Sequence, residues 1–166
     1  MATITLKGNQ INTSGEMPQT GTFAPNFKLT GNDLQDKTLI DFAGKRIVLN
    51  IFPSLDTPIC ALSVRKFNAE AAKLNNTVIL CISRDLPFAQ ARFCGAEGIK
   101  NVVTLSEFRD MNFGKDYELE IVDGPMAGLF ARAVIILDEK GKIIYTELVP
   151  EIVQEPNYDA AIKALI

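Results

Sequence analysis

The feature that most constrains the fold of this chain is an apolar run at residues 47–52, interrupted only by Asn50 and followed within a short loop by residues that start helices. A strand this apolar is typically buried on both faces of a sheet. In the next loop, Asp56 and Thr57 are favoured N-cap residues. Pro58 suits the first helical position because the NH that it lacks would have no partner there. Apolar residues then recur three and four positions apart, at Val64, Phe67, Ala71 and Leu74. The segment therefore predicts a buried strand, a short loop and a helix.

Cys60 occupies a special position in this segment. If Thr57 is the N-cap, Cys60 is the third helical residue, and its sulfur lies among unpaired backbone NH groups at the positive end of the helix. That environment favours a thiolate, the form of cysteine that acts as a nucleophile. Most free cysteines are small apolar fillers of the core. We nevertheless favour a functional, oxidant-accessible thiol, because α/β proteins present their chemistry at the carboxyl ends of strands.

The rest of the chain alternates strand and helix patterns. A β-hairpin is expected over 3–7 and 10–13, around Gly8 and Asn9, which suit a two-residue turn. Further strands are expected at 27–30, 37–42, 77–83, 102–105, 131–137 and 142–149. Further helices are expected at 88–93, after Pro87 and closed by Gly95 or Gly98, and at 158–165, capped by Asn157. Residues 107–128 show no clear pattern.

This order of elements predicts the fold class. Strand, helix, strand, helix and strand, followed by a hairpin and a helix, indicate an α/β protein with a mixed central sheet flanked by helices, as in thioredoxin-like domains. The β-hairpin at the N-terminus precedes this sheet. At 166 residues, with no repeat or linker, residues 1–166 are expected to form a single domain.

Composition excludes several classes of function. The chain has no histidine, which removes Ser-His-Asp and Cys-His catalysis and every zinc site that needs an imidazole. The three cysteines are too widely spaced for a zinc ribbon, and no glycine-rich phosphate loop is present. If the protein is an enzyme, it must work with thiol, hydroxyl, guanidinium and backbone groups.

Charge and hydropathy limit the possible partners and the cellular compartment of the protein. A net charge of -3 without a basic stripe argues against nucleic acid. No segment approaches the ~20 apolar residues that span a bilayer, and the N-terminus lacks the pattern of a secretory signal. We therefore expect a cytoplasmic protein that does not associate with membranes. In the cytoplasm, a functional cysteine is more often redox-active or catalytic than part of a structural disulfide.

The other two cysteines differ in their surroundings. Cys94 is near the end of the second helix and directly precedes Gly95, where local opening would let a thiol move. It could pack under its helix, or it could form a disulfide with Cys60 if their Cα atoms come within ~7 Å. Cys81 lies inside the apolar strand 77–83 and is expected to be structural.

Two further side chains could assist a thiolate. Thr57 would place its hydroxyl near Cys60, although helix capping is its ordinary role. Arg132 is a charge at the start of an otherwise apolar strand, where most arginines are simply solvated. A guanidinium that reached the sulfur would stabilise its negative charge and offer donors in a fixed fork to a bound oxygen species.

Nearly the whole chain, including the opening hairpin, resembles the thiol peroxidase branch of the peroxiredoxins. The active-site segment, Pro53-Ser54-Leu55-Asp56-Thr57-Pro58-Ile59-Cys60, is similar to that of the family. The agreement continues through residues 63–68, 81–90, 92–97 and 128–133. The pair of signatures around Cys60 and Cys94 is highly specific.

The resemblance implies a thioredoxin-like fold, a peroxidatic Cys60 and a resolving Cys94 in the same subunit. It also implies that Thr57 and Arg132 bind the peroxide and that Pro53 shields the sulfur. Hydrogen peroxide and alkyl hydroperoxides, including lipid ones, would be reduced to water and alcohols through a Cys60 sulfenic acid and a Cys60–Cys94 disulfide. Thioredoxin would reduce that disulfide in a homodimeric enzyme of antioxidant defence, with no cofactor or metal.

Two alternatives come from other classes of protein. A thioredoxin-like dithiol oxidoreductase could act on protein disulfides, although the chain has no Cys-x-x-Cys pair. A non-enzymatic binding or holdase module is the other alternative, and its cysteines would only pack in the core.

Overall fold

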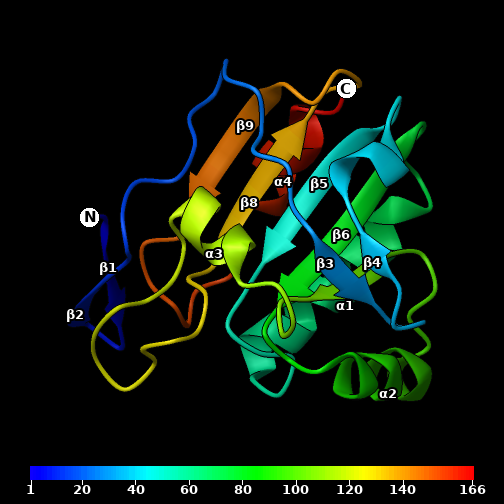
Figure 1. The fold of residues 1–166 in the computed structure, drawn as a ribbon. Coiled ribbons are helices and arrows are strands. Elements are labelled where there is room, and N and C mark those ends of the chain that lie inside the picture. The colour runs from blue at the N-terminus through cyan, green and yellow to red at the C-terminus, as the bar shows by residue number, and fades with distance from the viewer.

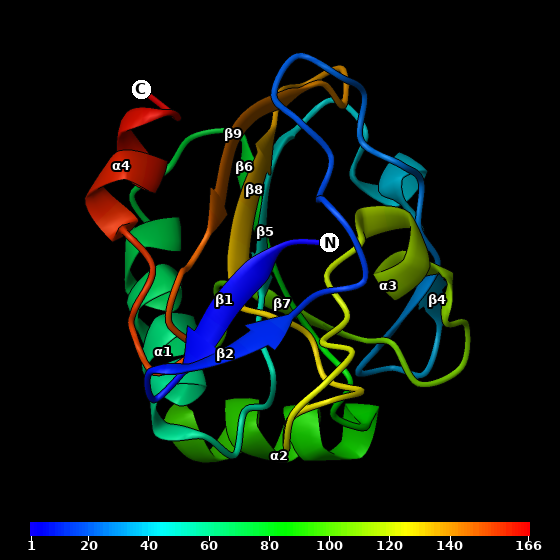
Figure 2. The same cartoon turned by 90° about the vertical axis from the view of Figure 1, so that its left-hand side faces the viewer.

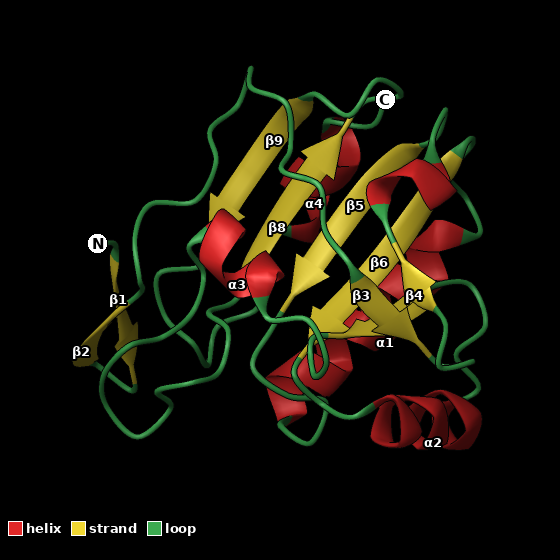
Figure 3. Ribbon diagram, in the orientation of Figure 1, coloured by secondary structure: helices red, strands yellow, loops and turns green.

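A computed structural model describes residues 1–166 and contains a seven-stranded sheet and a separate two-stranded one. The main sheet has the strand order β4-β3-β7-β6-β5-β8-β9 (Figures 1 and 3). Its strands are β3 Leu29–Gly31, β4 Asp36–Lys37, β5 Arg46–Ile51, β6 Thr77–Ser83, β7 Val103–Ser106, β8 Ala133–Leu137 and β9 Ile143–Leu148. Strands β5, β6 and β7 are parallel, whereas β8 is antiparallel to β5 and β3 is antiparallel to β7. The predicted mixed sheet is therefore confirmed.

Helices cover both faces of this sheet. The helices are α1 Pro58–Ala71, α2 Pro87–Glu97, α3 Asn112–Tyr117 and α4 Tyr158–Lys163. Seen along the sheet, α1 and α4 lie on one side and α3 lies on the other (Figure 2). Helix α2 contributes Phe93 and Cys94 to the apolar cluster that also contains residues of α1 and α4.

The central strand β5 is buried on both faces, as the sequence predicts. Every residue from 47 to 52 is buried. Val48 belongs to the apolar cluster under α1 and α4, whereas Leu49 and Ile51 belong to the cluster on the side of α3. Full burial of an aliphatic side chain of this size contributes roughly 1.5–3 kcal/mol to stability. A strand held from both sides in this way is a rigid base for the loop that follows it.

The N-terminal hairpin is confirmed, but its turn lies one residue earlier than predicted. Strands β1 (Thr3–Leu6) and β2 (Asn9–Asn12) pair with Leu6 opposite Asn9, so that Lys7 and Gly8 form the turn. Both turn residues have positive φ, 50° and 83°. A two-residue hairpin turn of this kind needs positive φ at both positions, which glycine adopts without strain.

One carboxylate attaches this hairpin to the rest of the protein. Glu151 accepts hydrogen bonds from the Thr5 hydroxyl at 2.9 Å, from the backbone NH groups of Lys7 and Gly8 at 3.1 and 2.9 Å, and from the NH of Val153 at 3.0 Å. These donors, the backbone NH groups of Val153 and Gly8 foremost, lower the pKa of Glu151 to about 2. We call Glu151 with these four donors the hairpin clasp.

Two segments differ from the pattern expected along the chain. Residues 37–42 do not form a strand: β4 ends at Lys37, and a 3-10 helix, η1, spans Leu39–Phe42. Asp41 accepts a hydrogen bond from the NH of Thr38 at 2.8 Å, which favours this helical turn and leaves Ile40 exposed. In the unassigned stretch 107–128, α3 forms a short helix that was not predicted. The helix over 88–93 is confirmed, and Gly98, in the left-handed conformation, ends it.

The hairpin clasp makes stability depend on pH. The pKa of Glu151 is about 2 in the folded protein against 4.5 for an unperturbed glutamate. Because the pKa is lowered, the contribution of the ionised Glu151 to the free energy of unfolding is fully present above pH ~4.5. It is lost as the pH falls towards ~2. Glu151→Gln should therefore lower the free energy of unfolding at pH 7 and flatten its pH dependence between ~4.5 and ~2, as measured by urea unfolding. Glu16→Gln, at an exposed position, is the control, and an unchanged pH slope in Glu151→Gln would contradict the assignment.

Candidate active site

Cys60 lies in the first turn of α1, directly beyond the carboxyl end of β5. Thr57 is the N-cap residue, with extended backbone angles of -105° and 143°, and Pro58 opens the helix, as the sequence predicts. The Ser63 hydroxyl donates a hydrogen bond to the Cys60 carbonyl at 2.8 Å. The Cys60 residue is 0% exposed, whereas the sequence led us to expect a thiol that solvent reaches.

The guanidinium of Arg132 reaches this buried sulfur. Arg132 directly precedes β8, the antiparallel neighbour of β5, so it lies beside the loop that carries Cys60. Its Nη2 lies 3.3 Å from Cys60 Sγ, and Nε and Nη2 also donate to the carbonyl of Ile152 at 3.0 and 2.8 Å. Arg132 is only 1% exposed, and its Nη1 has no hydrogen-bond partner. A buried guanidinium at this distance stabilises negative charge on the sulfur.

Thr57 also lies at the site, but its hydroxyl does not cap the helix. It donates instead to the carbonyl of Ser54 at 2.8 Å, so the turn from Ser54 to Thr57 fixes its direction. Thr57 and Arg132 line a cavity of about 240 Å³ whose other lining residues are Leu6, Lys7, Pro58, Ile59, Met126, Ile152 and Val153. Cys60 does not line the cavity. Pro53 is buried in the same loop.

Contacts with distant segments explain the difference between the expected and the observed exposure of Cys60. Its sulfur contacts Arg132, and Val134 and Ala161 belong to the same buried cluster. These residues are far from Cys60 in the sequence, so local helix geometry alone does not predict that they cover the sulfur.

Cys94 lies in the last turn of α2, in a partly buried position. Its sulfur is 3.9 Å from the Thr104 hydroxyl, and burial raises the pKa of its thiol. Its carbonyl accepts hydrogen bonds from the NH groups of Gly98 and Ile99, which end the helix. All three cysteines are free thiols in this structure.

The helices that carry Cys60 and Cys94 also contact each other. Arg65 of α1 and Glu97 of α2 form an ion pair at 3.5 Å, one to two turns beyond the two cysteines. The side chain of Asn68 in α1 accepts hydrogen bonds from the NH groups of Lys100 and Asn101, which follow α2. These contacts hold the end of α2 against α1.

Cys81 has the surroundings expected of a core residue. It is 0% exposed in β6, and burial raises the pKa of its thiol to about 12. The Asn50 side-chain amide nitrogen lies 3.7 Å from its sulfur and also donates to Ser63 at 3.3 Å. This thiol remains protonated at neutral pH, which suits a structural role.

Sequence reasoning missed the polar residues that support the Cys60 loop. Asp85 follows β6 and accepts hydrogen bonds from the Ser54 hydroxyl at 2.7 Å and the Leu55 NH at 2.8 Å. The Ile152 carbonyl, which holds Arg132, was also missed. One signal was available for Asp85: β5 and β6 are adjacent parallel strands, so the residues that follow them meet at one edge of the sheet.

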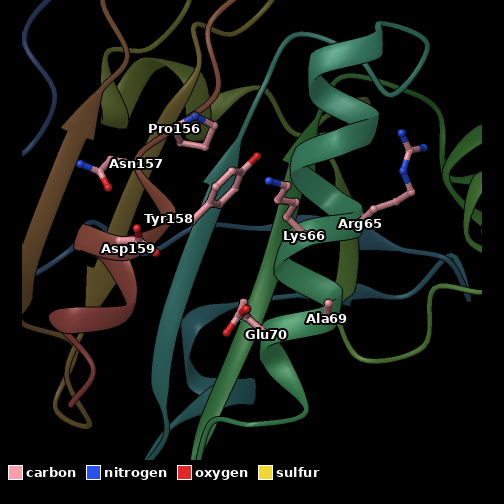
Figure 4. A pocket seen from close by; sticks show the side chains of 8 residues that line it. All are labelled: Arg65, Lys66, Ala69, Glu70, Pro156, Asn157, Tyr158 and Asp159. Carbon is pink, nitrogen blue, oxygen red and sulfur yellow. The ribbon is translucent and has the colours of Figure 1, made fainter.

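A larger cavity lies elsewhere in the molecule. It measures about 620 Å³ and opens between α1 and α4, where Arg65, Lys66, Ala69 and Glu70 face residues 156–159 (Figure 4). Its lining contains charges of both signs and no cysteine. No group of three or more cysteine, aspartate or glutamate side chains is arranged to hold a metal ion. No helix is both long and apolar enough to cross a bilayer.

The chain is similar to known proteins over nearly its whole length. Residues 19–162 match the family model described as Redoxin. Thiol peroxidases of Mycobacterium bovis and Mycobacterium tuberculosis are each 60% identical over 165 residues, which cover 99% of this chain and 99% of the relative.

Solved structures show the same fold. A peroxiredoxin-like protein from Aquifex aeolicus superposes with a TM-score of 0.91 at 39% identity, covering 98% of this chain and 95% of that chain. A thiol peroxidase from Chromobacterium violaceum also has a TM-score of 0.91, at 23% identity and with coverage of 98% and 94%, and supports the fold alone. The predicted thioredoxin-like fold is thereby confirmed. The chain belongs to the Redoxin family and, within it, to the thiol peroxidase branch of the peroxiredoxins.

Proposed function

We propose that this chain is a thioredoxin-dependent thiol peroxidase that reduces hydrogen peroxide and alkyl or lipid hydroperoxides, with Cys60 as the peroxidatic residue. The observation that carries the proposal is the 3.3 Å contact between the Arg132 guanidinium and the Cys60 sulfur in the first turn of a helix. The 60% identity to mycobacterial thiol peroxidases supports the same reaction class.

In the first step, the Cys60 thiolate attacks one peroxide oxygen. A sulfur–oxygen bond forms as the oxygen–oxygen bond breaks, and the other oxygen takes a proton and leaves as water or an alcohol. Cys60 becomes a sulfenic acid. The developing charge needs donors aimed at the oxygens. We assign these to the Cys60 NH and the Nη1 of Arg132, which is buried without a partner. The Thr57 hydroxyl, whose own proton goes to the Ser54 carbonyl, accepts a hydrogen bond from the O–H of the bound peroxide. Pro53, buried in the same loop, shields the sulfur.

In the second step, Cys94 resolves the sulfenic acid. Its sulfur displaces the hydroxyl from Cys60, water leaves and an intramolecular disulfide forms. The Cys60 sulfur contacts Arg132 and the Cys94 sulfur contacts Thr104, so the first turn of α1, the end of α2 or both must unwind for the two sulfurs to meet. Thioredoxin then returns the pair to dithiols by thiol–disulfide exchange.

The cavity at the site supports organic hydroperoxides as substrates. Beside Thr57 and Arg132 its walls are mostly apolar, with Leu6, Ile59 and Met126 among them. An alkyl group placed there would bury apolar surface while the peroxide reaches the donors.

We also propose that the protein is a cytoplasmic homodimer of single-domain subunits. Four large apolar side chains are exposed in the segments that follow the adjacent strands β6 and β7, at the same edge of the sheet as the Cys60 loop. We call them the exposed apolar patch: Leu86, Phe88, Phe108 and Met111. Phe88 alone is 69% exposed. A gathering of large exposed apolar side chains is typical of an interaction surface, and a second copy of the chain would cover it.

Peptide mass spectrometry after addition of one equivalent of hydrogen peroxide tests the function. We expect the reduced protein to lose two hydrogens and to contain a Cys60–Cys94 link.

Cys60→Ser should consume no peroxide, and Cys94→Ser should consume about one equivalent and then stall with thioredoxin. Cys81→Ser, the matched control, should turn over at a near-normal rate. An unmodified wild-type chain would contradict the proposal and favour a binding module, and reduction of insulin by the protein would favour a dithiol oxidoreductase.

Arg132→Met removes the positive charge and all the guanidinium donors while keeping a long side chain. Loss of one preorganised donor at a site of developing charge typically slows a reaction by roughly 10²–10³-fold. We expect a loss of that size in the rate of peroxide consumption and a shift of its pH dependence to higher pH. Arg132→Lys, which keeps the charge without the fork, should recover part of the rate. An unchanged rate and pH profile in a folded Arg132→Met protein would exclude this role.

Phe88→Asp places a charge in the exposed apolar patch. The wild-type protein is expected to sediment as a dimer at micromolar concentration and the variant as a monomer with unchanged secondary structure. Ile40→Asp, at an exposed residue of η1 away from the patch, is the matched control and should remain dimeric. A monomeric wild-type protein would contradict the proposed dimer.

A further inference from the structure

Asp85 connects the loop before Cys60 to the strand end that leads to the helix of Cys94. Its Oδ1 accepts a hydrogen bond from the Ser54 hydroxyl at 2.7 Å, and its Oδ2 accepts from the Leu55 NH at 2.8 Å and from the Ser83 hydroxyl at 2.6 Å. Hydrogen bonds to an ionised carboxylate are shorter and roughly twice as strong as neutral ones. One half-buried side chain therefore holds two separate segments.

On the Cys60 side, these bonds fix the turn that starts α1. The Ser54 carbonyl accepts hydrogen bonds from the NH and the hydroxyl of Thr57 at 3.1 and 2.8 Å, and the Ser54 hydroxyl accepts one from the NH of Asp56 at 3.1 Å. Asp85 thus anchors the residue that orients the Thr57 hydroxyl. If this anchor is lost, the first turn of α1 and Thr57 lose their support.

On the Cys94 side, the same network reaches α2. Gln90, one turn before Cys94 and fully buried, donates from Nε2 to the Ser83 hydroxyl at 3.2 Å and to the Leu105 carbonyl at 2.9 Å. The Ser106 hydroxyl donates to the Asp85 carbonyl. The start of α2 is therefore held to the ends of β6 and β7, and the Ser83 hydroxyl links this contact to the Asp85 carboxylate. In Figure 1 these segments gather at the lower end of the sheet.

We propose that Asp85 is a positioning residue that keeps the Cys60 turn and the start of α2 folded together during peroxide attack, and that its release permits the two cysteines to meet. This inference rests on the proposed function. Attack requires Thr57 and Cys60 to hold their places, whereas disulfide formation requires unwinding. The Asp85 network opposes that unwinding, so it favours the first step at the expense of the second.

The chemistry of the sulfenic acid makes this balance measurable. Cys60–SOH either condenses with the Cys94 thiol, forming the S–S bond and releasing water, or reacts with a second peroxide. In the second reaction sulfur gains an oxygen to become a sulfinic acid, and water or an alcohol leaves. A looser Asp85 network should speed condensation relative to both peroxide reactions.

The test uses the full reduced protein and hydrogen peroxide, with rapid quenching, alkylation and mass spectrometry, because the chain has no tryptophan to report by fluorescence. In Asp85→Asn we expect the ratio of the condensation rate constant to the attack rate constant to rise at least ~10-fold, with a smaller sulfinic fraction at high peroxide. Ser54→Ala removes one of the two Asp85 contacts on the Cys60 side, together with the bond from the Asp56 NH, and should raise the ratio ~3-fold.

Asp56→Asn is the matched control, because it removes the same charge from an exposed position in the same turn without touching Asp85. An unchanged or lower ratio in Asp85→Asn, or the same rise in Asp56→Asn, overturns the inference. If Asp85→Asn does not fold, Ser54→Ala decides in the same way. A wild-type protein that forms neither sulfenic acid nor disulfide would instead overturn the proposed function, so the two failures are distinguishable.

Discussion

The contact between the Arg132 guanidinium and the Cys60 sulfur is the constraint on which the rest of the site depends. A buried cation is costly unless other groups satisfy it. Here the partners are one carbonyl, that of Ile152, and the sulfur itself, while Nη1 has none. The guanidinium is therefore placed to stabilise a thiolate at Cys60. Folding holds this cation beside the sulfur at a cost in free energy.

That requirement gives the N-terminal hairpin a role in the site. The Ile152 carbonyl is fixed by its neighbours, because the Glu151 carboxylate binds the hairpin turn and the Ile152 NH donates to the carbonyl of Thr5 at 2.9 Å. The same hairpin supplies Leu6 and Lys7 to the cavity. A short two-stranded sheet is marginal by itself in water. Its attachment to residues 151–153 stabilises the hairpin and fixes the group that orients Arg132.

The sequence predicts the parts of this structure that follow from local pattern. Burial of residues 47–52 and the helix start at Pro58 depend on adjacent residues, and both are confirmed. The full burial of Cys60 depends on distant segments and was not foreseen. The stretch 107–128 was unreadable because long-range ion pairs, such as those of Arg84 with Glu107 and Glu120 at 2.7 and 3.0 Å, hold it rather than a periodic pattern.

The proposed mechanism requires both rigidity and local opening at the edge of the sheet where Cys60 lies. The proposed peroxide attack needs a fixed first turn of α1, since small displacements of aligned groups slow a reaction strongly. The proposed disulfide needs that turn, or the end of α2, to open, and helix ends are where local opening costs least. The strands β5 and β6 end beside each other, so Ser83 and Asp85 can hold the first turn of α1 and the start of α2 without the apolar core having to move. Cooperative release is then possible through a few hydrogen bonds, while the strands beneath remain packed.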